Sequence, residues 1–231
     1  MLTPAWVFAD NSEALKSAVQ EKNAIAVEQL IQRGLNPNIA YENGNTPLHL
    51  AAFEDTLPVI KVLLKAAGVG IDKKNTLGET PLMIAALKGN RQMVDILLAR
   101  GAQINQPGWT ALHYACSTGQ DEIVAELLDK FAYIDAESPN KTTPLMMAAR
   151  AGHLNTVKLL LQEGADPKLK NEQNLSAIDL AKKYNHLPVL SVLQSAINNQ
   201  QSPKPKEPAS LPSVPAGQIE GKLPVDKPWL R

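Results

Sequence analysis

The sequence lacks long apolar runs and carries a single cysteine, and its charges cancel. One cysteine excludes an internal disulfide, and Cys116 fills a slot that alanine fills in related stretches, which predicts a small buried side chain rather than a reactive thiol. No run of about 18 apolar residues is present, so no membrane-spanning helix is expected. The 23 Lys and Arg residues balance the 23 Asp and Glu residues, so the charge gives no sign of binding to nucleic acid or an anionic membrane.

What the sequence does contain is one motif in five copies. The first copy is Thr46-Pro47-Leu48-His49-Leu50-Ala51-Ala52. The copies begin at Thr46, Thr80, Thr110, Thr143 and, in degenerate form, Ser176, at spacings of 34, 30, 33 and 33 residues. A period in this range predicts a stacked array of repeats.

Each copy has the features of a short helix, a turn and a second helix. Thr46 is suited to cap a helix through its hydroxyl group, and Pro47 stands at the first helical position, where its missing N–H costs nothing. A turn residue follows nine positions after the Thr or Ser, and the second helix usually ends at a glycine, which adopts a left-handed conformation at least cost. The turn residues are Asp55, Gly89, Gly119, Gly152 and Asn185, and the helix-ending glycines are Gly34, Gly68, Gly101 and Gly164.

The motif and its spacing resemble the ankyrin repeat, whose hallmark is a Thr-Pro-Leu-His-x-Ala run in a unit of about 33 residues. The resemblance covers roughly residues 10–198. It implies an all-α ankyrin-repeat solenoid of helix-turn-helix repeats with short β-hairpin fingers. It also implies that His49 and His113, at the motif's histidine position, hydrogen-bond neighbouring backbone and tie successive repeats together.

We expect a repeat domain between two terminal segments. Its six repeats are expected at residues 10–43, 44–77, 78–107, 108–140, 141–173 and 174–198. Residues 1–9 are apolar and are either the remnant of an export signal or a flap packed on the first repeat, so the location, exported or cytoplasmic, stays open. Residues 199–231 hold seven prolines and are expected to be a disordered tail, either a passive spacer or a polyproline ligand for an aromatic groove.

Two irregularities interrupt the repeats. Three residues are missing between Gly101 and Thr110, so the finger there is expected to be short and to leave a notch in the row. Phe131 stands where the helix-ending glycine is expected, which predicts either strain or another helix ending. Together with Tyr133, it is expected to cover a local gap.

No catalytic or metal-binding signature is present. The sequence has no phosphate-binding glycine loop, Gly-x-Ser-x-Gly elbow or Cys-x-x-Cys pair. A repeat array would hold His49, His113, His153 and His186 far apart, which favours structural roles. We therefore expect no enzyme, no metal and no cofactor.

The resemblance implies non-catalytic binding of a protein partner, of unknown identity, through the concave face formed by finger tips and first helices. Regulation or inhibition of an enzyme or toxin is the alternative, and the chain is expected to be a monomer. The contact residues expected by position are Phe53, Leu77, Glu79, Leu87, Lys88, Trp109, Thr142, Arg150, Leu175 and Tyr184. Of these, Phe53, Leu77, Leu87 and Trp109 are expected to cluster. Alternatively, Trp109 packs on its own finger and Phe53 shields the turn at Asp55. The finger tips mix acidic and basic residues.

Overall fold

The computed structural model describes the backbone of residues 5–201 and the side chains of residues 11–198. Within this range the chain forms twelve helices and no strand. The predicted tail lies outside the described residues, apart from the end of the last helix. The helices are α1 Ala5–Gln20, α2 Ala24–Gln32, α3 Pro47–Phe53, α4 Leu57–Leu63, α5 Pro81–Lys88, α6 Arg91–Ala99, α7 Ala111–Thr118, α8 Asp121–Asp129, α9 Pro144–Ala151, α10 Leu154–Gln162, α11 Ala177–Lys183 and α12 Leu187–Gln201.

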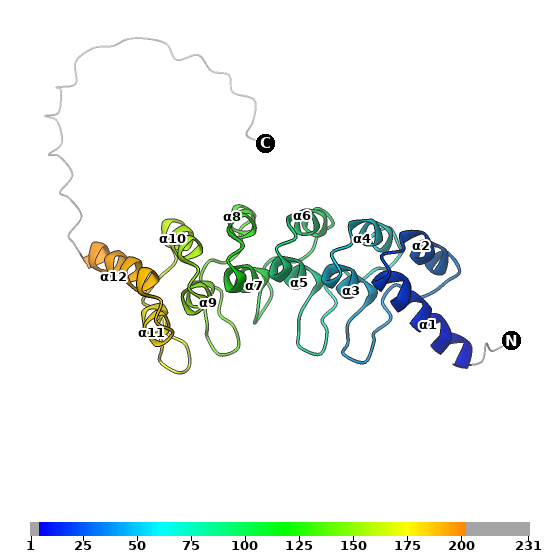
Figure 1. Ribbon diagram of the computed structural model, residues 1–231, viewed down its shortest axis with the longest axis horizontal. Helices are drawn as coiled ribbons and strands as arrows, with labels where there is room; N and C mark the ends of the chain where they lie inside the picture. The colour runs from blue at the N-terminus through cyan, green and yellow to red at the C-terminus, as the bar shows by residue number, and fades with distance from the viewer. Residues whose placement is uncertain (1–4, 202–231) are drawn as a thin grey trace, which may run out of the picture.

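The helices form two layers of an elongated array (Figure 1). The odd-numbered helices pack on one another in sequence order and make the inner layer, and the even-numbered helices make the outer layer. Loops that project beyond the inner layer join each outer helix to the next inner helix (Figure 1). The chain is therefore an all-α solenoid, as the motif spacing predicts.

Local sequence explains where the inner helices begin and end. The hydroxyl oxygen of Thr80 accepts a hydrogen bond from the backbone N–H of Met83 at 3.4 Å, and Pro81 occupies the first helical position. Gly89, at the turn, has a φ of 73°. Asp55 and Asn185 adopt the same left-handed conformation, with φ values of 54° and 61°. These turns are the ones predicted from the nine-residue offset.

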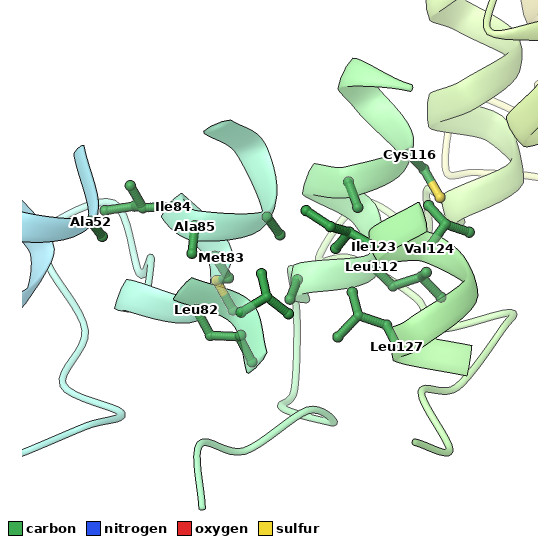
Figure 2. Packing of buried hydrophobic residues seen from close by; sticks show 14 of the residues in the cluster. Ala52, Leu82, Met83, Ile84, Ala85, Leu112, Cys116, Ile123, Val124 and Leu127 are labelled. Carbon is green, nitrogen blue, oxygen red and sulfur yellow. The ribbon is translucent and has the colours of Figure 1, made fainter. Parts of the chain in front are cut away.

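The core runs the length of the array between the two layers. In Figure 2, Leu82 and Met83 of α5 and Leu112 of α7 are among the apolar side chains drawn from neighbouring repeats, and all three are buried. Cys116 is fully buried, and burial raises the pKa of its thiol well above the usual range. It is a core filler, as its alignment with alanine predicts. Each fully buried leucine contributes about 1.5–3 kcal/mol to folding.

Five fingers connect the repeats, and we number them by residues: finger 1 is 34–45, finger 2 is 68–79, finger 3 is 101–109, finger 4 is 131–142 and finger 5 is 164–175. Each of the four long fingers has a backbone hydrogen bond of 3.0–3.1 Å between its arms, such as Tyr41 N–H to the Asn45 carbonyl. A second bond of 2.7–2.9 Å lies within the turn, such as Gly44 N–H to the Tyr41 carbonyl. These two bonds make a hairpin-like turn but not a ladder. The expected β-hairpins are therefore turns without strands in the described part of the chain.

Finger 3 divides the row of fingers into two pairs. The backbone N–H of Thr76 in finger 2 donates to Asn43 in finger 1 at 3.1 Å, and Glu172 in finger 5 donates to Asn140 in finger 4 at 3.0 Å. In the described range, no such backbone bond reaches the tip of finger 3. Finger 3 is also visibly the shortest in Figure 1. The predicted notch is present, and it separates fingers 1 and 2 from fingers 4 and 5.

Phe131 ends α8 in the conformation that glycine adopts in the other repeats. Its φ is 63°, within the left-handed region, which costs a residue with a Cβ atom about 1–2 kcal/mol. Its side chain is 84% exposed, and that of Tyr133 is 68% exposed. The expectation that the two rings cover a gap is wrong, because a ring that fills a gap loses its exposure to solvent.

Replacing Phe131 by glycine is expected to raise the free energy of unfolding by about 1 kcal/mol, since it relieves the left-handed strain and removes an exposed ring. Equilibrium urea denaturation measures this change. Gly164→Ala is the matched control in the next repeat. Gly164 has a φ of 97° and open space around an added Cβ, so alanine there should destabilise by a similar amount. A less stable Phe131→Gly variant would show that the ring contributes packing.

Candidate partner-binding face

The predicted contact residues lie on the fingers and on the C-terminal ends of the inner helices. We call this surface the finger face. The Thr or Ser caps determine which residues form this surface. Each cap sets where its inner helix begins, so the residues seven and eight positions later lie at the end of that helix. The side chains at these two positions are Phe53 and Glu54, Leu87 and Lys88, Ser117 and Thr118, Arg150 and Ala151, and Lys183 and Tyr184.

Finger 2 and the end of α3 each carry one exposed large apolar side chain, and Phe131 and Tyr133 are exposed at the start of finger 4. Leu77, near the tip of finger 2, is 75% exposed. Phe53 is 49% exposed, and the Lys88 ammonium group lies 4.8 Å from the centre of its ring. Phe53 therefore reaches toward the next repeat, while Asp55 accepts a hydrogen bond from Asn90. Leu87 is half-buried.

Trp109 packs partly on its own repeat. Its ring meets that of His113 edge to face, with centroids 5.3 Å apart, and it is half-buried. The contact matches the alternative interpretation for this residue. The structure thus joins Phe53 with Lys88 and Trp109 with His113, and among the described side chains it records no ring contact between Phe53 and Trp109.

One predicted contact residue is wrong. Thr142 is only 6% exposed. Its backbone N–H donates to the Ser138 hydroxyl at 2.9 Å, and its carbonyl oxygen accepts from His113 Nε2 at 2.9 Å. Thr142 is the last residue of finger 4, and its carbonyl oxygen also accepts the bond from Ser138 N–H that closes the finger. Thr142 therefore holds finger 4 and presents no side chain to a partner.

Glu79 is held in place by two neighbours. Its Oε1 accepts from the Tyr114 hydroxyl at 3.0 Å, and its Oε2 accepts from Asn75 Nδ2 at 2.8 Å. Burial, and next the bond to Glu79, raise the pKa of Tyr114 above its usual range, so this hydroxyl stays a donor. Glu79 is half-buried, as is Leu175 on finger 5.

At the other end of the face, cations surround an aromatic ring. The Arg150 guanidinium carbon lies 5.4 Å from the centre of the Tyr184 ring, and Lys183 Nζ lies 5.9 Å from it. Tyr184 is 42% exposed, and both cationic side chains are exposed. The Arg150–Tyr184 contact resembles the Phe53–Lys88 contact in reverse. Here the earlier repeat supplies the cation and the later repeat supplies the ring.

Two motif histidines join successive repeats, as the resemblance implies. His113 Nδ1 lies 3.2 Å from the backbone nitrogen of Thr110, and its Nε2 lies 2.9 Å from the Thr142 carbonyl oxygen. Because a backbone N–H only donates, Nδ1 accepts, and the proton is on Nε2. His49 has the same arrangement, with Nε2 at 3.0 Å from the Glu79 carbonyl oxygen. Burial lowers the pKa of both rings, to about 4 for His113.

The other two histidines reach back to the preceding repeat. His153 Nε2 lies 3.1 Å from the Ser117 carbonyl oxygen, and His186 Nε2 lies 3.0 Å from that of Arg150. Each ring lies over a turn glycine. A Cβ atom added to Gly119 would lie 2.7 Å from His153 Nδ1. All four histidines therefore have structural roles, and each spans a repeat boundary.

A ladder of side-chain bonds links the finger bases, and the sequence analysis missed it. The side chains of Asn38, Asp72, Asn105 and Asp135 accept from the backbone N–H of Gly70, Gln103, Tyr133 and Asp166 at 2.6, 3.0, 2.8 and 3.2 Å. The signal was an Asn or Asp four residues after each helix-ending residue. Lys168 occupies this position after Gly164, so the ladder ends there.

The described residues lack two other features, a metal-binding cluster and a membrane-spanning helix. No group of three or more His, Cys, Asp and Glu side chains in that part of the chain is placed to hold a metal ion. Among the same residues, none of the helices has the length and apolar character needed to cross a membrane.

The fold and this face define a class of protein: a helical repeat array with projecting fingers. Models of ankyrin repeats match residues 5–75, 58–138 and 127–181. The solved ankyrin repeat domain of Bcl-3, a member of the IkappaB family, superposes with a TM-score of 0.67 at 27% identity over 78% of this chain and 81% of that one. The chain belongs to the ankyrin repeat family, whose repeats are protein–protein interaction modules.

Relatives share the repeats within much longer proteins. The Ankyrin repeat and KH domain-containing protein mask-1 of Caenorhabditis elegans is 31% identical over 65% of this chain and 6% of its own length. The Nuclear factor NF-kappa-B p105 subunit of Gallus gallus is 32% identical over 71% of this chain and 18% of its own. This chain therefore spans less than a fifth of either relative.

The His113 ring predicts a loss of stability in acid. Its pKa is about 4 when folded and about 6.5 when unfolded, so the unfolded chain binds more protons between these values. The stabilisation is complete above pH 6.5 and is lost as the pH falls toward 4, by up to about 3 kcal/mol. Urea denaturation across this range should show a flatter dependence for His113→Gln. Leu187→Ala, at an exposed residue with no ionisable group, is the control and should keep the wild-type slope. Equal slopes for wild type and His113→Gln would contradict the prediction.

The ladder predicts a second stability effect. Asn105→Ala removes the bond from Tyr133 N–H and the 2.8 Å bond from Asn105 Nδ2 to the Phe131 carbonyl oxygen. The expected loss is about 1–2 kcal/mol, measured by urea denaturation. Lys168→Ala, at the same position where the ladder ends, should change stability by less than about 0.5 kcal/mol. Equal effects of the two substitutions would show that the ladder does not stabilise the array.

Proposed function

We propose that this chain is a non-catalytic, monomeric module that binds a partner protein through the concave side of its array, the finger face. The observation that carries the proposal is the exposure of Leu77 and Phe53 on this face. Large apolar side chains exposed on one face are typical of binding hot spots. The Lys88 ammonium group also lies over the ring of Phe53.

The arrangement of the titratable groups favours binding over catalysis. His49 and His113 are buried, with both ring nitrogens in hydrogen bonds that hold repeats together. Burial also keeps the Cys116 thiol protonated. These groups serve the scaffold, which leaves the exposed side chains of the finger face to serve recognition.

A stiff scaffold favours such binding. The finger tips are bonded in pairs, and the finger bases are bonded through the ladder that begins at Asn38. A surface ordered in advance loses little conformational entropy when a partner docks. The remaining contact residues that we propose for this face are Glu79, Leu87, Lys88, Trp109, Arg150, Leu175 and Tyr184.

The double variant Phe53→Ala/Leu77→Ala tests the proposal. Both side chains are exposed, so we expect an unchanged circular-dichroism melt and a loss of about 2 kcal/mol or more in binding to the native partner. The partner is first captured with wild-type protein from the native cell, and titration calorimetry then gives its affinity for each variant.

Ile25→Ala/Leu187→Ala is the matched control. Ile25 on α2 and Leu187 on α12 are also exposed aliphatic residues, but they belong to the outer layer. This variant should keep wild-type affinity. Loss of the partner by the control alone would move the binding site to the outer layer and reject the finger face. A partner whose own activity changes in the complex would make the chain a regulator of that partner.

A further inference from the structure

The balanced total charge conceals a division along the array. Residues 1–140 contain 11 basic and 16 acidic residues, a net of −5. Residues 141–198 contain 7 basic and 4 acidic residues, a net of +3. The two parts meet within finger 4. The part of the chain before this point is net negative, and the repeats after it are net positive.

In the net-positive repeats, several cationic side chains gather around the ring of Tyr184. Arg150 from α9 and Lys183 from α11 both lie against the ring of Tyr184. Lys170 on finger 5 and Lys182 on α11 are exposed and both interact with the charge of Asp179. We call Arg150, Lys170, Lys182, Lys183 and Tyr184 the basic patch.

The positive charges of the basic patch are not neutralised by ion pairs. Among the described side chains the ion pairs within 4 Å are those of Lys16 with Glu13 and of Arg91 with Glu122 and Glu126, all outside the patch. Asp179 is committed to the cap of α11, where it accepts from Ser176 N–H at 2.9 Å and from the Ser176 hydroxyl at 2.7 Å. The patch therefore keeps a net positive charge beside Asp179, and Arg150 and Lys183 form no ion pair within 4 Å among the described side chains.

The aromatic ring draws these groups together. Cation–π attraction to the Tyr184 ring favours conformations in which the flexible Arg150 and Lys183 side chains lie against it before binding. A guanidinium group binds a carboxylate through two parallel hydrogen bonds, and a nearby ammonium group suits a second carboxylate. The exposed part of the Tyr184 ring is suited to contact an apolar side chain that lies between the two carboxylates of the ligand.

We infer that the basic patch docks a short acidic segment of the partner protein, with carboxylates at Arg150 and Lys183 and an apolar side chain at Tyr184. The inference rests on the proposed binding function and names the chemistry of one part of the partner. A short segment fits better than a long polyanion, because residues 1–140 carry a net −5 and repel negative charge that extends along the row. Such repulsion acts over a screening length of about 8–10 Å.

The test uses a fluorescein-labelled peptide in which glutamates alternate with leucines, and fluorescence anisotropy as the readout. We expect binding to the full chain that weakens as salt is raised, and that weakens about tenfold or more in Arg150→Glu/Lys183→Glu. Lys61→Glu/Lys65→Glu is the matched control. It makes the same change in net charge at two exposed lysines of the segment around α4, and should keep wild-type affinity. The same peptide with glutamine for glutamate should not bind.

Three results would overturn the inference. They are no binding of the glutamate peptide to wild type, equal binding by Arg150→Glu/Lys183→Glu, and tighter binding of a thymine oligonucleotide or of phosphatidylserine vesicles at the same ionic strength. The outcome is separable from the proposed function. If Phe53→Ala/Leu77→Ala loses the native partner while Arg150→Glu/Lys183→Glu keeps it, the finger face binds protein but the acidic segment is wrong.

Discussion

The packing of each inner helix on the next is the contact on which the rest of the array depends. A helix of seven or eight residues buries too little surface to be stable alone, and its apolar stripe is covered only when another repeat lies on each side. The paired alanines, such as Ala85 and Ala86, keep the helices close enough for leucines to interlock. This spacing then sets the distance between fingers, and thus the spacing of every side chain on the finger face.

Polar side chains at the repeat boundaries must form hydrogen bonds across this same spacing. Different residue types form these bonds at different boundaries. Between the layers, Asn90, His153 and His186 each reach the preceding repeat, although they hydrogen-bond different partners. At the finger bases, Asn and Asp alternate along the ladder. Every one of these bonds spans about one repeat in sequence. Their combined effect is directional: they resist sliding and rotation between repeats, which apolar packing alone permits.

Much of the fold can be predicted from the sequence because each repeat starts and ends its helices with residues that lie nearby in the sequence. Caps, turn residues and helix-ending glycines act within a few positions, so Thr80 and Gly89 predict α5 correctly. The candidate site is harder to predict, since exposure depends on what the next repeat supplies. Thr142 is buried at the end of finger 4, where His113 of the preceding repeat bonds its carbonyl oxygen. Phe53 lies under a lysine of the following repeat, and no rule within one repeat reveals that contact.

Several irregularities fall near the middle of the array, and together they give the face two distinct parts. Finger 3 lacks tip bonds, Phe131 ends α8 with strain, and the net charge changes sign within finger 4. On one side lie the exposed apolar groups Phe53 and Leu77, and on the other lie Arg150 and Lys183 around Tyr184. Helix packing is continuous through α5, α7 and α9, so the two parts are held at a fixed separation. A partner that uses both must therefore present an apolar surface and an acidic segment at that same separation, which is a more selective requirement than either contact alone.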